Sequence, residues 1–130
     1  MGGLSKLALA AALALATTVS AEAACSTRQI GGTWLMLSSA GVLCSVLGTQ
    51  AGKIQKSNCY NLADISRAAG KLTGTFRVDA KCTVTGTLTE VAGGRRQNFT
   101  FEGKLKGGKT IEGVSRYPSG VVAVLAYKQW

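Results

Sequence analysis

Histidine is absent from this 130-residue chain, and acidic residues are scarce, with six Asp and Glu against 15 Lys and Arg. Histidine is the most versatile acid–base group near neutral pH and the commonest metal ligand. Motifs of the GxSxG, phosphate-loop and dinucleotide-binding types are also missing. No two of the acids beyond residue 23 are placed to share a buried cleft, as acid–base hydrolysis requires. We therefore expect no enzyme activity, no cofactor and no metal site.

Long hydrophobic runs are also missing, because the longest one, Leu7 to Ala16, is far short of the roughly 20 residues that span a bilayer. It follows a basic start at Lys6 and precedes Ala21-Glu22-Ala23, a small-x-small pattern that signal peptidases cleave. Residues 1–23 are interpreted as a cleaved signal peptide, with a buried N-terminal helix as the alternative, and residues 24–130 as a single domain. The short, alanine-rich signal is typical of bacteria, which predicts a periplasmic or secreted protein.

Two strand-like runs of alternating apolar and polar residues flank Asp79-Ala80-Lys81. Side chains alternate between the two faces of a strand, so Leu72, Phe76 and Val84 share one face and threonines the other. Folding the chain back around Ala80 places Gly74 opposite Gly86. The runs 98–105 and 110–117 repeat this pattern, and folding around Gly108 pairs Gly103 with Gly113 and Lys104 with Glu112.

Each of these four strands therefore carries one inward glycine, although glycine in a strand costs about 0.5 to 1 kcal/mol relative to alanine. Two explanations are open. Glycine permits the sharp bends of a sheet that closes into a barrel. Alternatively, the missing side chains leave an internal cavity for a ligand. The four positions are Gly74, Gly86, Gly103 and Gly113.

Further strands are predicted at 33–38, 42–47, 52–57 and 121–128, which brings the number to about eight. Short turns rich in Gly, Ser or Pro connect them. The predicted fold is all-β, a single antiparallel up-and-down β-barrel. The segment 61–69 is the exception, because Asn61 as a cap and Gly70 after the end favour a short helix, with a ninth strand as the alternative.

An even number of cysteines in a short exported chain predicts two disulfides, and the absence of a CxxC pair argues against a metal site. In a meander, Cys59 ends the third strand at one end of the barrel and Cys82 begins the fifth at the other. Disulfide partners need Cα atoms within about 7 Å. The predicted pairs are therefore Cys44 with Cys59 and Cys25 with Cys82, although a separate strand at 61–69 would undo this reasoning.

Two short stretches resemble the calycins, the superfamily of lipocalins and avidins. Gly32-Thr33-Trp34 is similar to the Gly-x-Trp that opens the lipocalin barrel, and residues 70–76 (GKLTGTF) are similar to a Gly-x-Leu-Thr-Gly-Thr-aromatic stretch of avidins. Lipocalins also place an Arg over that Trp near the end of the barrel, but no Arg follows Arg116. Avidins surround biotin with several tryptophans, but this chain has only two. The resemblance therefore implies the barrel and no particular ligand.

The net charge of +9 favours an anionic partner. The strand pairing predicts that six cations share one region, which would dock an anionic envelope component or another protein, a solvated basic face being the alternative. Nucleic acid is disfavoured because no aromatic residues are interleaved with these cations. The six are Arg95, Arg96, Lys104, Lys106, Lys109 and Arg116.

These observations predict a non-enzymatic exported barrel that binds a macromolecular partner, in the manner of small periplasmic inhibitors. One alternative is a carrier that holds a small apolar ligand inside the barrel, near the inward glycines. Another is a structural subunit of a cell-envelope assembly, which predicts an exposed apolar patch around Val121, Ala123 and Leu125. Outer faces built of Thr, Arg and Lys argue against an integral membrane protein.

Overall fold

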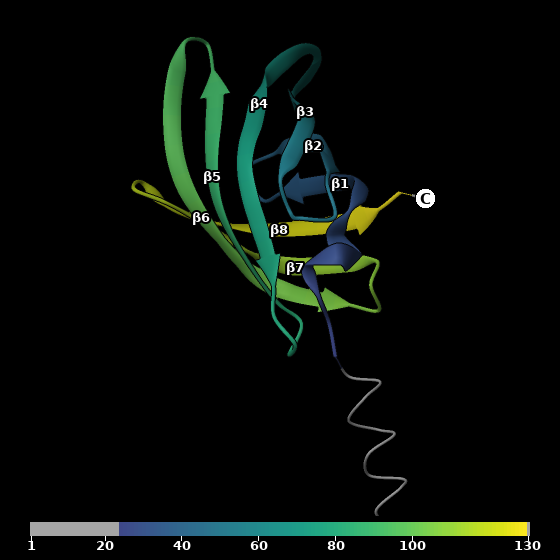
Figure 1. Ribbon diagram of the computed structural model, residues 1–130. Coiled ribbons are helices and arrows are strands. Elements are labelled where there is room, and N and C mark those ends of the chain that lie inside the picture. The colour runs from purple at the N-terminus through teal and green to yellow at the C-terminus, as the bar shows by residue number, and fades with distance from the viewer. Residues whose placement is uncertain (1–23, 130) are drawn as a thin grey trace, which may run out of the picture.

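The computed structural model describes residues 24–129, which form a closed antiparallel β-barrel (Figure 1). Each strand pairs with its neighbours in the chain, and the first strand also pairs with the last. This confirms the predicted all-β up-and-down barrel and is compatible with a calycin-like fold. The elements are η1 (Thr27–Ile30), β1 (Gly32–Ser38), β2 (Val42–Gly48), β3 (Ile54–Asn61), β4 (Asp64–Val78), β5 (Thr83–Ala92), β6 (Arg95–Lys106), β7 (Thr110–Tyr117) and β8 (Gly120–Lys128).

The predicted signal peptide, residues 1–23, lies outside the described residues. Within the described chain, the search for a membrane-crossing helix, one both long and apolar, finds none. Both predicted disulfides, Cys25–Cys82 and Cys44–Cys59, are present, and such bonds indicate an oxidising environment of the periplasmic or extracellular kind.

The predicted register of the β6–β7 hairpin is confirmed, because Gly103 lies opposite Gly113 and Lys104 opposite Glu112. The expected cross-strand charge pair forms differently, however. Glu112 accepts from Lys106 Nζ at 2.6 Å, whereas Lys104 Nζ donates to Thr83 Oγ1 at 2.7 Å. Glu112 thus pairs with the diagonal lysine of β6, while Lys104 turns to Thr83, which lies directly opposite it on β5.

The predicted register of the β4–β5 hairpin is wrong by two residues, since Gly74 lies opposite Leu88 and Phe76 opposite Gly86. The loop explains the shift. The Asp79 N–H donates to the Thr83 carbonyl at 3.0 Å, so the hairpin closes around Lys81 instead of Ala80. Asp79 Oδ1 accepts from the backbone of Lys81 and Thr83, and Cys82 adopts a left-handed φ of 67°. A shift by two keeps every side chain on its predicted face.

The helix predicted at 61–69 is wrong, because this segment turns and then starts the 15-residue strand β4. Asn61 does act as a cap, but its Oδ1 accepts from the Ala63 N–H in a tight turn. The segment has no apolar stripe that a helix could bury, and Leu62 and Ile65 are exposed. The ninth strand does not form separately either, since β4 runs on to Val78, and the disulfide reasoning therefore holds.

Ser57 holds the seam between β3 and β4, where the ladder of the described chain pairs residues only near the β3–β4 turn. Its Oγ donates to the Leu72 carbonyl at 2.6 Å and accepts from the Leu72 N–H at 2.7 Å. Ser57 and Leu72 are both buried, so the hydroxyl satisfies two backbone groups that would otherwise lack partners. The Ser57 side chain thus replaces a pair of backbone hydrogen bonds between β3 and β4 and keeps the barrel closed.

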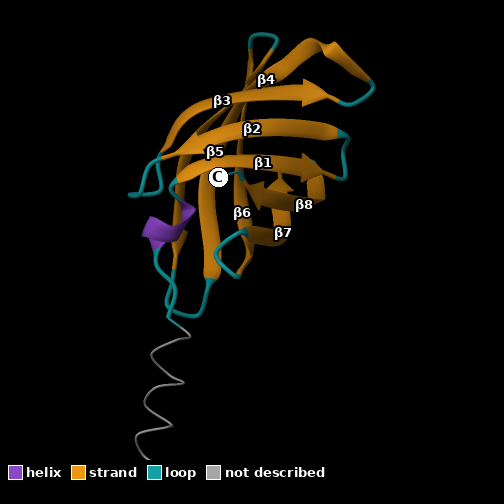
Figure 2. Cartoon of the chain, turned by 90° about the vertical axis from the view of Figure 1, so that its right-hand side faces the viewer, coloured by secondary structure: helices purple, strands orange, loops and turns teal. Residues whose placement is uncertain are grey.

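One end of the barrel is closed by η1, which lies across the start of β1 (Figure 2). The buried Trp34 donates from Nε1 to the Ile30 carbonyl at 2.9 Å. Lys128 Nζ lies 5.9 Å from the centroid of the Trp34 ring and donates to the Gln29 carbonyl at 2.9 Å. A cation therefore does cover the first-strand Trp, although it is a lysine of β8 and not the arginine that the resemblance led us to seek.

The inward glycines make room for two phenylalanine rings that fill the barrel next to the closed end. A Cβ on Gly86 would lie 2.8 Å from the Phe76 ring. A Cβ on Gly113 would overlap the Glu102 carbonyl and lie 2.7 Å from the Phe101 ring. The two rings meet edge to face with centroids 5.8 Å apart. The inward glycines, hereafter the glycine belt, therefore serve packing and close strand approach. The alternative of a ligand cavity beside them finds no support, because about 30 Å³ of space is left next to the two rings.

Candidate functional site

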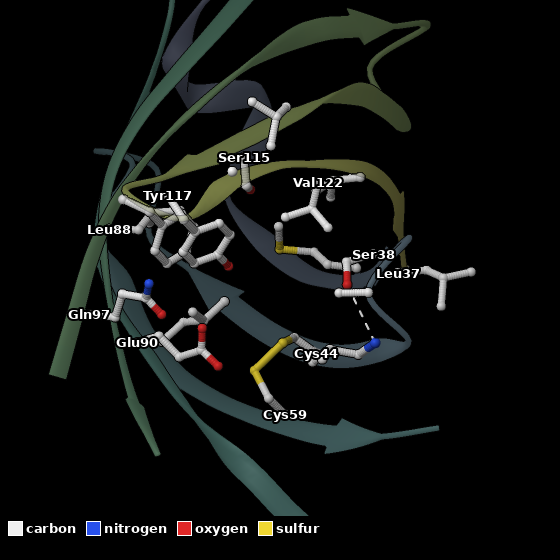
Figure 3. A pocket seen from close by; sticks show the side chains of 18 of the residues that line it. Leu37, Ser38, Cys44, Cys59, Leu88, Glu90, Gln97, Ser115, Tyr117 and Val122 are labelled. Atoms are coloured by element: carbon white, nitrogen blue, oxygen red, sulfur yellow. Dashed lines mark hydrogen bonds between the residues drawn. A yellow bond between two sulfur atoms is a disulfide. The ribbon is translucent and has the colours of Figure 1, made fainter. Parts of the chain in front are cut away.

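A cavity of about 410 Å³ occupies the other end of the barrel, hereafter the open end, where the β1–β2 and β7–β8 turns lie (Figure 3). This volume is within the range of small-molecule sites, roughly 300 to 1,000 Å³. Most of its surface is apolar. The apolar lining includes Met36, Val42, Leu72, Leu88, Phe99 and Val124.

The floor and one wall of the cavity are rigid. Leu88 and Phe99 are buried beneath it, and the Cys44–Cys59 disulfide lines its side. Below them only about 30 Å³ of space is left between Trp34, the Phe rings and their neighbours. The interior is thus divided into a filled half at η1 and a hollow half at the open end.

Three polar side chains, the polar cluster, gather on one side of the cavity (Figure 3): Glu90 of β5, Gln97 of β6 and Tyr117 of β7. Glu90 and Gln97 are direct partners across the β5–β6 ladder. The Tyr117 ring stacks on Phe99 with centroids 4.4 Å apart. All three continue the inner face of their strands into the mouth, where the alternation that buries Leu88 and Phe99 brings a polar residue inward.

Burial raises the pKa of Tyr117 to about 12, and the charge of Glu90 and a hydrogen bond to its carboxylate contribute further. The phenol therefore stays protonated at neutral pH, beside the Glu90 carboxylate. The ion pairs found within residues 24–129, Asp64 with Arg67 and Lys106 with Glu112, lie elsewhere. Glu90 is also the only charged residue among those that line the cavity. The cavity thus combines apolar walls with one carboxylate.

We expect Tyr117 to ionise about two pH units later than an ordinary tyrosine. A raised pKa in the folded state means that the contribution of Tyr117 to stability is present below pH 10 and lost as the pH rises to about 12. Absorbance titration of phenolate should show a late step that Tyr117→Phe removes. Glu90→Gln should move this step to lower pH without abolishing the shift, since burial is its largest cause. A late step that survives in Tyr117→Phe would contradict the assignment.

The six predicted partner-binding cations do not form one region. Arg95 and Arg96 begin β6 at the open end, whereas Lys104 and Lys106 end the same strand beside the β6–β7 turn, which holds Lys109. At about 3.3 Å per residue, the nine residues from Arg95 to Lys104 span roughly 30 Å. Arg116 lies between them, opposite Thr100. The role of these residues in binding stays a prediction, but for two separate groups.

The apolar patch expected on β8 is present and wider than predicted. Val121 and Leu125 are 60% and 36% exposed, and Ala123 is exposed too. The patch continues onto neighbouring strands, because Leu125 lies opposite Leu37 and Leu37 opposite Leu43. We call this the outer apolar face; its residues are Leu35, Leu37, Leu43, Val121, Ala123, Leu125 and Tyr127.

Sequence reasoning missed the polar cluster, although the signal was within reach. Gln97 lies two positions before Phe99, Glu90 two after Leu88 and Tyr117 two after Ser115, so each belongs to the inner face by alternation. The sequence did not show that this part of the barrel is hollow.

No family model matches the chain, and comparisons with curated proteins and with solved structures found no match.

Proposed function

We propose that this protein is a non-enzymatic exported barrel that holds a small, mainly apolar ligand in the cavity at its open end. The observation that carries the proposal is the cavity itself, about 410 Å³ with largely apolar walls above a filled floor. Apolar surface gains free energy when it leaves water, by about 25 cal/mol per Å². A rigid hollow of this kind binds an apolar body at little cost in ordering.

The architecture supports a place among the calycins. The chain begins the barrel with Gly-x-Trp, closes it with η1 and covers Trp34 with a cation from the last strand. Calycin-like barrels of about eight strands are wide enough to hold one small ligand. The ligand position proposed here is the open end, away from the glycine belt.

Binding is tested with a neutral apolar fluorescent probe, N-phenyl-1-naphthylamine. We expect saturable enhancement of its fluorescence by the wild-type protein. Val122→Trp should weaken binding by about tenfold or more, because Val122 lines the cavity and a large ring would fill it. Ala123→Trp is the matched control, since the next residue of β8 points to the exposed outer face. Equal binding by both variants, or none by the wild type, would contradict the proposal.

The outer apolar face supports a second proposal, in which the barrel docks a protein partner in an inhibitor-like manner or as a subunit of an envelope assembly. Exposed apolar patches that span several strands are typical of interaction sites. Native mass spectrometry of protein purified from its own envelope separates the two proposals. A co-purifying small molecule supports the carrier, whereas a complex with protein and an empty barrel supports the docking surface.

A further inference from the structure

We propose that the ligand of this cavity carries a protonated amine at one end of its apolar body, and that Glu90 selects it. This inference rests on the proposed function and adds the chemical class of the ligand. Glu90 is the only charged residue among those that line the cavity. A single carboxylate in a mainly apolar hollow distinguishes ligands by the charge of their polar end.

The carboxylate has acceptor capacity to spare. A carboxylate offers about four lone-pair positions. The Tyr117 side chain lies beside the carboxylate, and neither ion pair of the described residues involves Glu90. Glu90 and Gln97 also lie side by side on neighbouring strands, facing the hollow that the ligand would fill (Figure 3). An ammonium group with three donors matches this arrangement.

An anionic ligand end fits poorly at the same place. It would meet the Glu90 carboxylate in a half-buried setting, where like charges repel more strongly than in water. Tyr117 stays a neutral phenol at neutral pH and therefore supplies no positive charge that would offset this repulsion. The stacked Phe99–Tyr117 pair adds aromatic surface beside the carboxylate, and such surface favours a cation.

The arginines nearest in the chain do not neutralise Glu90. Arg96 lies opposite Val91 on the ladder, one residue out of step with Gln97, and therefore projects from the outer face. Arg95 shares the face of Gln97 by alternation, but it is exposed at the β5–β6 turn, where β6 begins. Neither residue lines the cavity, and neither forms an ion pair in the described part of the chain. The positive charge that Glu90 lacks is therefore left for the ligand to supply.

The test uses three eight-carbon competitors of the fluorescent probe: octylamine, octanol and octanoate. Wild type should bind octylamine about tenfold more tightly than octanol, because a charge-assisted hydrogen bond is roughly twice as strong as a neutral one. Octanoate should bind most weakly. Glu90→Gln keeps the shape of the side chain and should bring octylamine and octanol within about twofold of each other, with octanol unchanged.

Glu112→Gln is the matched control. It removes the same charge from the outer face of β7, where Glu112 pairs with Lys106, and should leave the preference for octylamine intact. If wild type binds the probe but takes octanol as tightly as octylamine, the inference is wrong while the carrier function stands. If no competitor and no probe binds, both are wrong.

Discussion

Replacing Cys25 and Cys82 together by serine should lower the free energy of unfolding by about 4 kcal/mol. The bond closes a loop with a sequence separation of 57 residues, and cross-links of that span restrict the unfolded chain by about this amount. It also ties the segment before η1 to the β4–β5 turn, where the Cys25 N–H donates to the Ala80 carbonyl at 3.2 Å. Urea unfolding followed by tryptophan fluorescence measures the loss, because Trp34 packs beneath η1.

Thr27→Val is the control for this disulfide variant. Thr27 Oγ1 accepts from the Val78 N–H at 3.0 Å, so the substitution weakens the same closed end and leaves the covalent bond intact. It should cost about 1 to 2 kcal/mol, because Thr27 Oγ1 also donates to the Val78 carbonyl at 3.4 Å and both hydrogen bonds are lost. Probe binding should survive in both variants, because the cavity is at the opposite end. A disulfide variant no less stable than Thr27→Val would mean that the bond does not anchor η1.

Gly113→Ala should destabilise the barrel by about 3 kcal/mol or more, at the upper end of what overpacking costs. The added methyl would overlap the Glu102 carbonyl of the neighbouring strand and lie 2.7 Å from Gly103 Cα, and backbone atoms inside a closed sheet cannot move aside. Gly93→Ala is the control. Gly93 has open space around it and a φ of 57°, so alanine there costs only the left-handed strain of about 1 to 2 kcal/mol.

Gly86 separates the two roles of the glycine belt. The nearest atoms to a Cβ there belong to the Phe76 ring, at 2.8 and 2.9 Å, and not to backbone. Gly86→Ala should therefore be rescued in part by Phe76→Leu, whereas no trimming of Phe101 should rescue Gly113→Ala. Unfolding free energies of the single and double variants give the coupling. Equal losses for Gly113→Ala and Gly93→Ala would contradict the steric argument.

The period-2 pattern was sufficient to predict the faces of the central strand segments, because alternation is local and the inner positions from Leu72 to Leu88 and from Phe99 to Tyr117 follow from it directly. The register of the β4–β5 hairpin was harder to predict from the sequence. It depended on the loop after Val78, where the Asp79 carboxylate and the left-handed Cys82 set the length of the turn. Nothing in the alternation changes when a hairpin slips by two residues, so the pattern alone could not detect the error.

The candidate site was harder to predict than the fold. The inward glycines left both sheet bending and an internal cavity open as explanations. The Phe76 and Phe101 rings fill the space beside them, and ring placement depends on contacts between distant strands. The cation cluster failed for a different reason. Arg95 and Lys104 are on the same strand, and the 12 residues of β6 keep its ends apart. Alternation places Glu90 on the inner face, but its importance depends on the hollow beside it, which the sequence does not show.

The pairing of β1 with β8 has a consequence for assembly in the cell. The first strand finds its last neighbour only after residues 120–128 have been delivered, and Lys128 then reaches the Gln29 carbonyl, 99 positions earlier in the chain. Contacts of such long range slow folding. Until β8 pairs with β1, the incomplete barrel exposes two unpaired strand edges, which are prone to aggregate. A chaperone that shields these edges until residues 120–128 are available would meet this need.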